Sequence, residues 1–316
     1  METDPKLKYL PIFGLKNNAA VCYLNSVLQS FLTTKYLLGS FEEYDEEQYT
    51  ASLIKLIDNI RSHKHFLITQ NEEQLHNLIN RKHFAIIDPK KFIRKFIRTD
   101  ENELSEYAQQ DAHVFLTFLI DKVYEETKFT KFCYNKFRSY TLCTDCKHVN
   151  KGTEKEPILF LSLQDSLVKS LSKIVKPTRP KDYKCENCDK KNTTQKQIFP
   201  KKIAKLFIVT LLRFDNYGRK IDDSIKVPLN IPINKIMYMN SHPEEISEEE
   251  KNKIYKLKSA IFHHGTYNRG HYTCISKRAN NEWYHFNDEH VEHIEINNPS
   301  IQNYLSKAYI LIYSDE

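Results

Sequence analysis

Residues 17–29 read NNAAVCYLNSVLQ and place a cysteine, Cys22, at the start of a predicted helix. From Cys22 onward the apolar residues recur at helical spacing and form one face: Leu24, Val27, Leu28, Phe31 and Leu32. Free backbone N–H groups and the positive end of the helix dipole favour a thiolate there, and the thiolate is the nucleophilic form of cysteine. A lone cysteine on an apolar helix is more often a small buried side chain, so the catalytic interpretation needs support from elsewhere in the chain.

A histidine-containing segment far along the chain supplies that support. An H-x-G-x(4)-G-H-Y pattern runs from His263 to Tyr272 and contains His271, and the residues WYHFND follow at 283–288. A cysteine protease needs a thiolate, an imidazole that transfers the proton and a third group that holds the imidazole, all brought together by the fold. The residues after His271 are aromatic and β-branched, which predicts a strand that holds the ring.

Four of the seven cysteines form a second strong pattern. They occur as two C-x-x-C pairs, Cys143 with Cys146 and Cys185 with Cys188. Paired cysteines at this spacing are typical of a tetrahedral, structural zinc site. We therefore predict one structural Zn²⁺ per chain, and His148 is left as a solvated loop residue because four thiolates already complete such a site.

Together these segments resemble the ubiquitin-specific protease family of deubiquitinases. The family's cysteine box, roughly G-L-x-N-x-G-x-T-C-Y-x-N-S-x-L-Q, is matched over Gly14–Gln29, and residues 109–115 (QQDAHVF) resemble its Q-Q-D-A-x-E-F segment. Three further blocks follow in the family's order: Glu156-Pro157 with Leu161-Ser162-Leu163, Leu212-Arg213-Phe214, and Tyr255-x-Leu257 before His263. The resemblance covers the chain from about Gly14 to Tyr313.

The resemblance implies an α+β, papain-like fold in a single catalytic domain over residues 12–315. It implies a helical thumb at about 12–130, zinc-tied β-ribbon fingers at about 132–212 and a β-sheet palm at about 213–315 plus flanking strands, with the active site between the helical and sheet lobes. The sequence pattern agrees, since helical periodicity dominates up to about residue 130, including Gln110–Tyr124, and strand-like runs such as Leu206–Leu212 and Ala308–Tyr313 dominate from about 132. We also predict a helix at Lys90–Arg98 and a charged loop at Pro243–Lys251.

The resemblance also implies a role for each site residue. Cys22 attacks the carbonyl of the glycine that ends ubiquitin, and His271 takes the thiol proton and later protonates the departing lysine amine. Asn17 aligns with the family's oxyanion-hole asparagine. Asp111 aligns with an acid that meets an arginine in the ubiquitin tail.

The third catalytic group must be chosen between two neighbours. Asn287 aligns with the position where the family uses Asp or Asn, and it is expected to accept the Nδ1–H bond of His271, with Asp288 as a supporting group. If the segment is extended, adjacent side chains point to opposite faces and only one of them can face His271 directly. His263 is expected to lie behind the site.

Departures from the family pattern keep alternatives open. Ala19 replaces a glycine and would be strained by roughly 1–2 kcal/mol if its backbone were left-handed. Val21 replaces a threonine, and Val114 and Ile275 are expected to be packing changes. An active deubiquitinase is the leading interpretation, ahead of a ubiquitin-binding module with weakened catalysis and a zinc-ribbon nucleic-acid binder. Only Lys147, Lys151, Lys190 and Lys191 hint at the last one.

Composition sets the remaining expectations. The 316 residues are 40% hydrophobic and carry a formal net charge of +6, modest for this length. No apolar run is long enough to span a bilayer, and the N-terminus does not resemble a signal peptide. We expect a protein of the cytoplasm or nucleus, with ubiquitin and ubiquitinated proteins as partners and neither a membrane nor nucleic acid.

Overall fold

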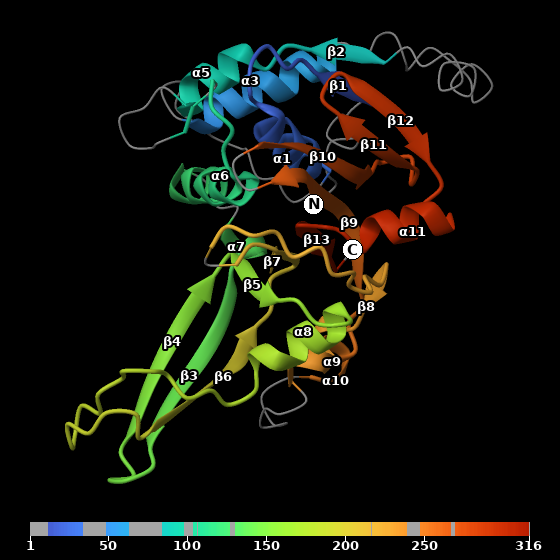
Figure 1. The fold of residues 1–316 in the computed structure, drawn as a ribbon. Helices are drawn as coiled ribbons and strands as arrows, with labels where there is room; N and C mark the ends of the chain where they lie inside the picture. Colours follow the sequence, from blue (N-terminus) through green and yellow to red (C-terminus); the bar gives the residue numbers. More distant parts are fainter. Residues whose placement is uncertain are drawn as a thin grey trace. The chain divides into compact units, whose positions relative to one another are not determined.

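The computed structural model describes residues 12–33, 49–62, 84–97, 104–105, 107–126, 130–215, 217–238, 247–266 and 269–315. It contains helices and strands in an α+β arrangement, as predicted (Figure 1). The chain divides into two compact units, residues 1–131, 213–222 and 258–312 (unit 1) and residues 132–212, 223–257 and 313–316 (unit 2). Among the described helices, none combines the length and apolar character required to cross a membrane. The predicted boundaries of thumb, fingers and palm stay a prediction.

Four helices of unit 1 lie in the part of the chain where helical periodicity is predicted. They are α1 (Cys22–Phe31), α3 (Tyr49–Ser62), α5 (Lys90–Ile97) and α6 (Ala112–Glu126). The buried residues of α6 recur every three or four positions, from Ala112 to Val123, which confirms the predicted apolar face. Helix α5 is also as predicted up to Ile97, and Arg98 lies outside the described residues.

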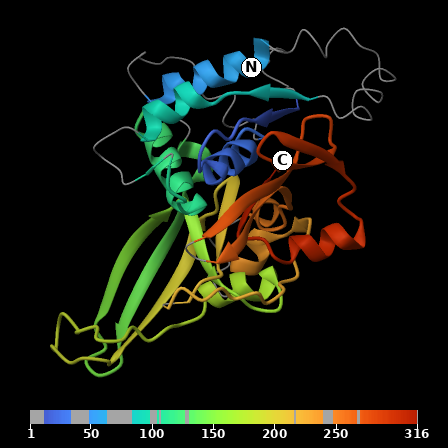
Figure 2. The ribbon, with the colours of Figure 1, turned by 45° about the horizontal axis from the view of Figure 1, so that its top comes forward.

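Helix α1 is the centre of the core of unit 1, because all ten of its residues are buried. Its polar side chains therefore need partners. The amide of Gln29 donates to the Phe13 carbonyl at 2.7 Å, and the hydroxyls of Ser30 and Ser259 lie 2.7 Å apart. Figures 1 and 2 both show α1 beside β10 (Arg269–Lys277). The helix is thus fixed on all sides, including its first residue, Cys22.

The strands of unit 1 lie in the order β12 (His290–Ile294), β11 (Trp283–Asn287), β10, β9 (Tyr255–Thr266) and β13 (Ile310–Ser314). The pairs β9–β10, β10–β11 and β11–β12 are antiparallel, and His271 stands opposite His264. Helix α11 (Pro299–Leu305) precedes β13. A separate parallel pair joins β1 (Phe13–Leu15) to β2 (Ala85–Ile87).

Unit 2 contains a three-stranded ribbon in the order β4 (Val149–Glu156), β3 (Asn135–Cys143) and β6 (Thr194–Lys202). The short helix α7 (Thr130–Cys133) precedes β3. A parallel pair joins β5 (Ile158–Ser162) to β7 (Leu206–Leu212), which is almost wholly buried, as its continuous apolar run predicts. The two residues of β8 (Asn230–Ile231) pair with the start of β9.

Three short helices complete unit 2: α8 (Leu167–Ile174), α9 (Ile233–Tyr238) and α10 (Glu248–Lys251). The last of them corrects the predicted charged loop at Pro243–Lys251. The Ser247 hydroxyl accepts a hydrogen bond from the Glu250 N–H. Glutamates occupy the first turn, where their negative charge interacts favourably with the positive end of the helix dipole. Residues 243–246 lie outside the described part.

Candidate active site and zinc-binding site

Cys22 is the first residue of α1 and is only 4% exposed. The loop before it is held by Asn17, whose Oδ1 accepts the backbone N–H of Ala19 at 3.3 Å and of Val21 at 3.2 Å. Val21 is the helix N-cap and offers no side-chain cap. Ala19 has no positive φ, so the strain considered for it does not arise. The side chain of Asn17 thus orders the turn that presents the thiol at the helix N-terminus.

His271 lies near the start of β10, next to a glycine that admits no side chain. A Cβ on Gly270 would lie 2.0 Å from His263 Nε2. The backbone of Gly270 is also paired with the side chain of Gln109, which donates to the Gly270 carbonyl and accepts its N–H at 2.6 Å. The two hydrogen bonds of the Gln109 side chain therefore fix the backbone next to His271.

The imidazole of His271 has a partner on each of two sides. Its Nε2 lies 2.6 Å from Asn287 Oδ1, and the Cys22 side chain acts on the pKa of the ring as well. Hydrogen bonding with Cys22, followed by the bond to Asn287 and the charges of Cys22 and Asp288, raises the pKa of His271 to about 9 although burial opposes it. The ring is consequently protonated at neutral pH.

The ring nitrogens are reversed relative to the sequence-based expectation. Asn287 was expected to bind Nδ1, but Nε2 is the nitrogen that faces it. With Nε2 bound to Asn287, Nδ1 is the nitrogen that is left for Cys22. The prediction was wrong because the orientation of a ring on its strand depends on which neighbouring element reaches it, and sequence order does not contain that information.

Asp288 occupies the turn between β11 and β12, with a left-handed backbone (φ 51°). Its Oδ2 accepts an N–H of Asn17 at 2.8 Å, and its Oδ1 accepts an N–H of Asn25 at 2.8 Å. Its Oδ2 also lies 4.0 Å from His271 Nε2. The condition of an extended segment therefore fails at Asp288, so Asn287 and Asp288 both approach the imidazole.

The same turn packs closely against β1. The Leu15 N–H donates to the Asp288 carbonyl at 2.9 Å, and a Cβ on Gly14 would lie 2.3 Å from the Glu289 carbonyl oxygen. Only glycine permits so close an approach of two backbones. In this chain the close contact with Glu289 therefore requires a glycine at position 14, eight positions before Cys22.

Asp111 lies at the start of α6 with part of its carboxylate exposed. Both carboxylate oxygens accept from the Tyr309 hydroxyl, at 2.9 and 2.8 Å, and the His113 ring lies 3.2 Å from Oδ1. Burial acts to raise the pKa of Asp111, but the hydrogen bonds and the charge of His113, with the Tyr309 bond, keep it below its usual value. Its partly exposed carboxylate is thus an anion of the kind that binds a guanidinium.

Three other residues discussed from sequence are placed as follows. His263 is buried against the rings of Phe214 and Tyr272, and burial lowers its pKa to about 4. Ile275 is fully buried, in agreement with a packing change. Val114 is 45% exposed, so its interpretation as a packing change was wrong. It occupies a solvent-facing position of α6.

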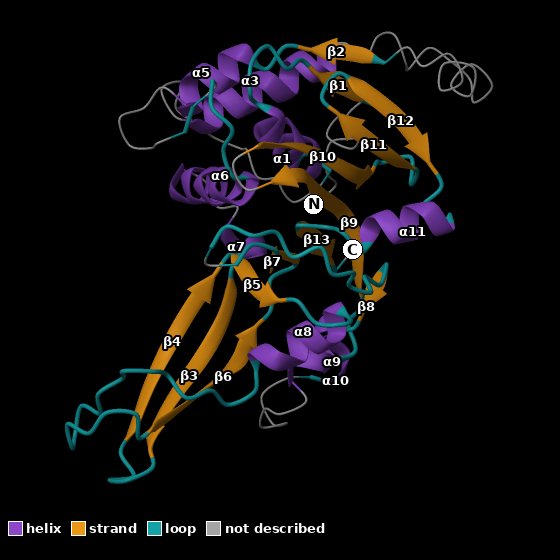
Figure 3. Ribbon diagram, viewed as in Figure 1, coloured by secondary structure: helices purple, strands orange, loops and turns teal. Residues whose placement is uncertain are grey.

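The four cysteines of the two C-x-x-C pairs converge at the end of the ribbon in unit 2. Their sulfurs all lie within 4.8 Å of one another, with Cys143 and Cys188 at 3.7 Å and Cys146 and Cys185 at 3.7 Å. A tetrahedral ion with Zn–S bonds of about 2.3 Å places its sulfurs about 3.8 Å apart. The four residues therefore fit Zn²⁺. Cys143 is the last residue of β3, and Figure 3 shows the loops at this end of β3, β4 and β6.

Comparison with known proteins gives the family. The family model for ubiquitin carboxyl-terminal hydrolase matches residues 13–313. The chain belongs to the ubiquitin carboxyl-terminal hydrolase family. This membership confirms the resemblance noted above and the prediction of a cysteine-type hydrolase.

Individual members of the family are distant in sequence. Ubiquitin carboxyl-terminal hydrolase 8 of Saccharomyces cerevisiae is 25% identical over 346 residues, which cover 95% of this chain and 70% of that protein. Ubiquitin carboxyl-terminal hydrolase 20 of Arabidopsis thaliana is 27% identical over 322 residues, covering 96% of this chain and 43% of that protein. The chain thus spans less than half of the second relative.

Solved structures share the fold. A chain of the SAGA DUB module bound to monoubiquitin matches with a TM-score of 0.71 and 21% identity, over 99% of this chain and 71% of that chain. A chain of the SAGA Ubp8/Sgf11/Sus1/Sgf73 DUB module bound to ubiquitin aldehyde matches with a TM-score of 0.69 and 20% identity, over the same shares. The ubiquitin-specific protease fold predicted from the motifs is therefore confirmed.

Two residues of this hydrolase contact the site although sequence reasoning gave them no role. Asn25 binds Asp288, and Gln109 holds the backbone before His271. Both belong to segments that match the family motifs, Gly14–Gln29 and residues 109–115. A polar side chain inside the apolar run of α1 was the available signal for Asn25, because a buried amide needs partners.

Proposed function

We propose that the chain is a cysteine-type deubiquitinase that hydrolyses the peptide or isopeptide bond after the C-terminal glycine of ubiquitin. The observation that carries the proposal is the placement of the His271 imidazole, whose Nε2 lies 2.6 Å from Asn287 Oδ1 and whose pKa is raised first by the Cys22 side chain. A nucleophile, a base and a group that orients the base are the minimum for acyl transfer through a covalent intermediate.

The reaction divides into two transfers. The Cys22 sulfur attacks the glycine carbonyl, its proton having passed to His271, and a tetrahedral oxyanion forms. As the C–N bond breaks, His271 gives that proton to the lysine amine and a thioester remains. Water, deprotonated by His271, then hydrolyses the thioester and restores the thiol. A ring with a pKa of about 9 is already protonated at neutral pH, so it is prepared to act as the acid.

Asn17 is the proposed donor to the oxyanion, together with the Cys22 backbone N–H. One hydrogen of its Nδ2 is used for Asp288 at 2.8 Å, and the second is left for a substrate oxygen. Since its Oδ1 holds two N–H groups of the loop, the amide is fixed before substrate arrives. Such preorganised donors stabilise charge that develops in the transition state.

Other residues are proposed to bind ubiquitin or maintain the fold. Asp111 would receive an arginine of the ubiquitin tail. Cys143, Cys146, Cys185 and Cys188 would hold a zinc ion that stabilises the ribbon and takes no part in the chemistry. Ubiquitinated proteins are the proposed partners, and the cytoplasm or nucleus the proposed location, where free cysteines persist.

A ubiquitin with a C-terminal fluorophore tests the proposal. Release of the fluorophore is expected from the wild-type chain, and Cys22→Ala should abolish it while retaining ubiquitin binding. Cys133→Ala, which removes a buried thiol elsewhere, is the matched control and should remain active. Binding of ubiquitin by the wild-type chain without turnover would instead support the alternative of a ubiquitin-binding module.

A further inference from the structure

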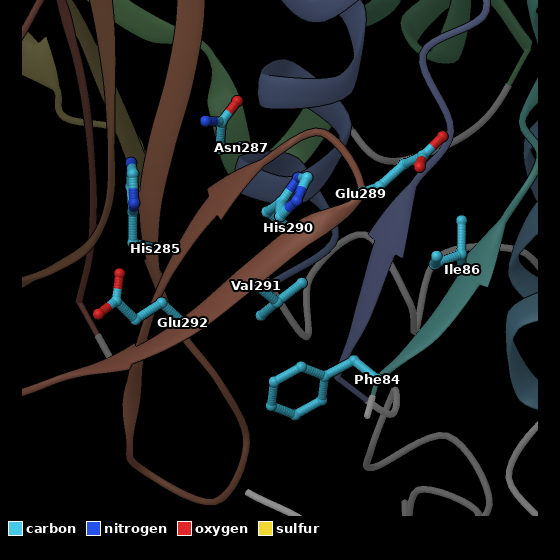
Figure 4. Close-up of a pocket in the computed structure, with 8 residues that line it drawn as sticks. All are labelled: Phe84, Ile86, His285, Asn287, Glu289, His290, Val291 and Glu292. Carbon is cyan, nitrogen blue, oxygen red and sulfur yellow. The ribbon is translucent and has the colours of Figure 1, made fainter. Parts of the chain in front are cut away.

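A groove of about 530 Å³ borders the side of the candidate active site formed by β11 and β12. Asn287 is part of its wall, together with Glu289, Val291 and Glu292 of the hairpin and Phe84 and Ile86 before and on β2 (Figure 4). Through Asn287 the groove is one hydrogen bond from the His271 imidazole. It is therefore continuous with the site rather than remote from it.

The strand order of unit 1 indicates which part of a substrate reaches this groove. Asp111 accepts a hydrogen bond from the hydroxyl of Tyr309, which lies just before β13, and the Tyr309 N–H donates to the Ile261 carbonyl on β9. The groove lies instead on β11 and β12. His271, on β10, stands between them. If the ubiquitin tail passes Asp111 and ends at Cys22, the chain on the other side of the scissile bond continues toward the groove. That chain is the protein carrying the modified lysine.

The lining of the groove is suited to cationic side chains. Two carboxylates, Glu289 and Glu292, line the groove, and the imidazoles of His285 and His290 line it with them (Figure 4). Burial lowers the pKa of His285, which favours its neutral form. Phe84 and Ile86, the latter 54% exposed, add an apolar surface on the facing side. Lysine and arginine place their aliphatic stems on such surfaces and their charges on carboxylates. Neutral or acidic segments would gain only the apolar part of this contact.

We propose that the groove binds a basic segment next to the ubiquitinated lysine of the substrate protein. This proposal rests on the proposed deubiquitinase function and adds a preference on the leaving-group side of the bond. Exposed ion pairs contribute little individually, so two of them are expected to change kcat/KM by about 2- to 30-fold in total. The preference should weaken as salt screens the carboxylates.

Three ubiquitin substrates test the groove: one with a C-terminal fluorophore, one joined through an isopeptide bond to a lysine in a basic peptide, and one joined to the same lysine in an acidic peptide. For the wild-type chain, kcat/KM should be higher for the basic than for the acidic peptide. In the double variant Glu289→Gln and Glu292→Gln the ratio of basic to acidic should approach one. Glu295→Gln, an exposed carboxylate just beyond β12, is the matched control and should keep the wild-type ratio.

The outcomes separate the two proposals. Hydrolysis of the fluorogenic substrate with equal rates on both peptides would overturn the groove proposal and leave the deubiquitinase proposal intact. A preference that survives in the double variant would also overturn it. Failure to hydrolyse all three substrates would contradict the proposed function and, with it, the groove.

Discussion

Asp288→Asn is expected to impair catalysis through Asn17 rather than through the fold. The substitution keeps the size of the side chain, and asparagine tolerates the left-handed backbone at this turn. It leaves one acceptor oxygen where two N–H groups, from Asn17 and Asn25, are now bound at 2.8 Å each. Because Asn25 is buried and cannot exchange its partner for water, Asn17 is the one expected to lose its bond.

The size of the effect follows from what Asn17 does. A hydrogen bond to a charged group contributes about 1.5–3 kcal/mol, and loss of one oxyanion donor costs about 10²- to 10³-fold in kcat. We therefore expect Asp288→Asn to lower kcat by about 10- to 10³-fold. From sequence alone, Asn287→Ala is expected to reduce turnover more than a change of Asp288. The contacts of Asp288 raise the expected loss of kcat on changing it to at least that of Asn287→Ala.

A double-mutant cycle tests whether the effect passes through Asn17. Single-turnover rates on fluorogenic ubiquitin would be measured for Asn17→Ala, Asp288→Asn and the double variant, with melting temperatures as the folding control. If the two residues act as a unit, adding Asp288→Asn to Asn17→Ala should lower the rate less than tenfold further. Fully multiplicative losses, or an Asp288→Asn rate within threefold of wild type, would refute the reasoning.

Three further predictions concern other features. The stabilising contribution of protonated His271 is present below its usual pKa of 6.5 and is lost as the pH rises through about 9. Because the ring then lacks the proton that the departing amine takes, kcat/KM should fall above about pH 9, and Asp288→Asn should move this fall to lower pH since it removes a charge that raises the pKa of His271. A fall at the same pH in the variant and in the wild type would contradict this. Metal analysis should find one zinc per chain, and Cys143→Ser should lower the melting temperature, whereas metal-free protein of wild-type stability would count against the site. Gly14→Ala should destabilise the protein by about 1–3 kcal/mol in urea unfolding, since its Cβ would meet the Glu289 carbonyl, and an unchanged midpoint would show that this contact is absent.

Local patterns were sufficient to predict much of the fold. Apolar residues at helical spacing predicted α1 and α6, a continuous apolar run predicted β7, and the paired cysteine spacings predicted the cluster of four sulfurs. Each of these depends on residues close together in sequence, where periodicity reports directly on burial.

Features that depend on distant contacts were beyond such reasoning. Which nitrogen of His271 binds Asn287 depends on the side from which Cys22 approaches the ring. The left-handed turn at Asp288 depends on its backbone hydrogen bond to Leu15 of β1. Charge density favoured a loop where Ser247 in fact caps the helix α10. In the candidate site, the sequence predicted residues that the structure brings together, but not which of their atoms are in contact.

Covalent labelling of Cys22 is the most direct test of the central claim. The wild-type protein would be treated with ubiquitin bearing a C-terminal electrophile, and the modified residue mapped by mass spectrometry of its peptides. A single adduct on the Cys22 sulfur is predicted, dependent on His271 and lost in Cys22→Ala. An adduct on Cys133 or Cys274 instead, or no adduct with folded protein, would contradict the assignment of Cys22 as the nucleophile.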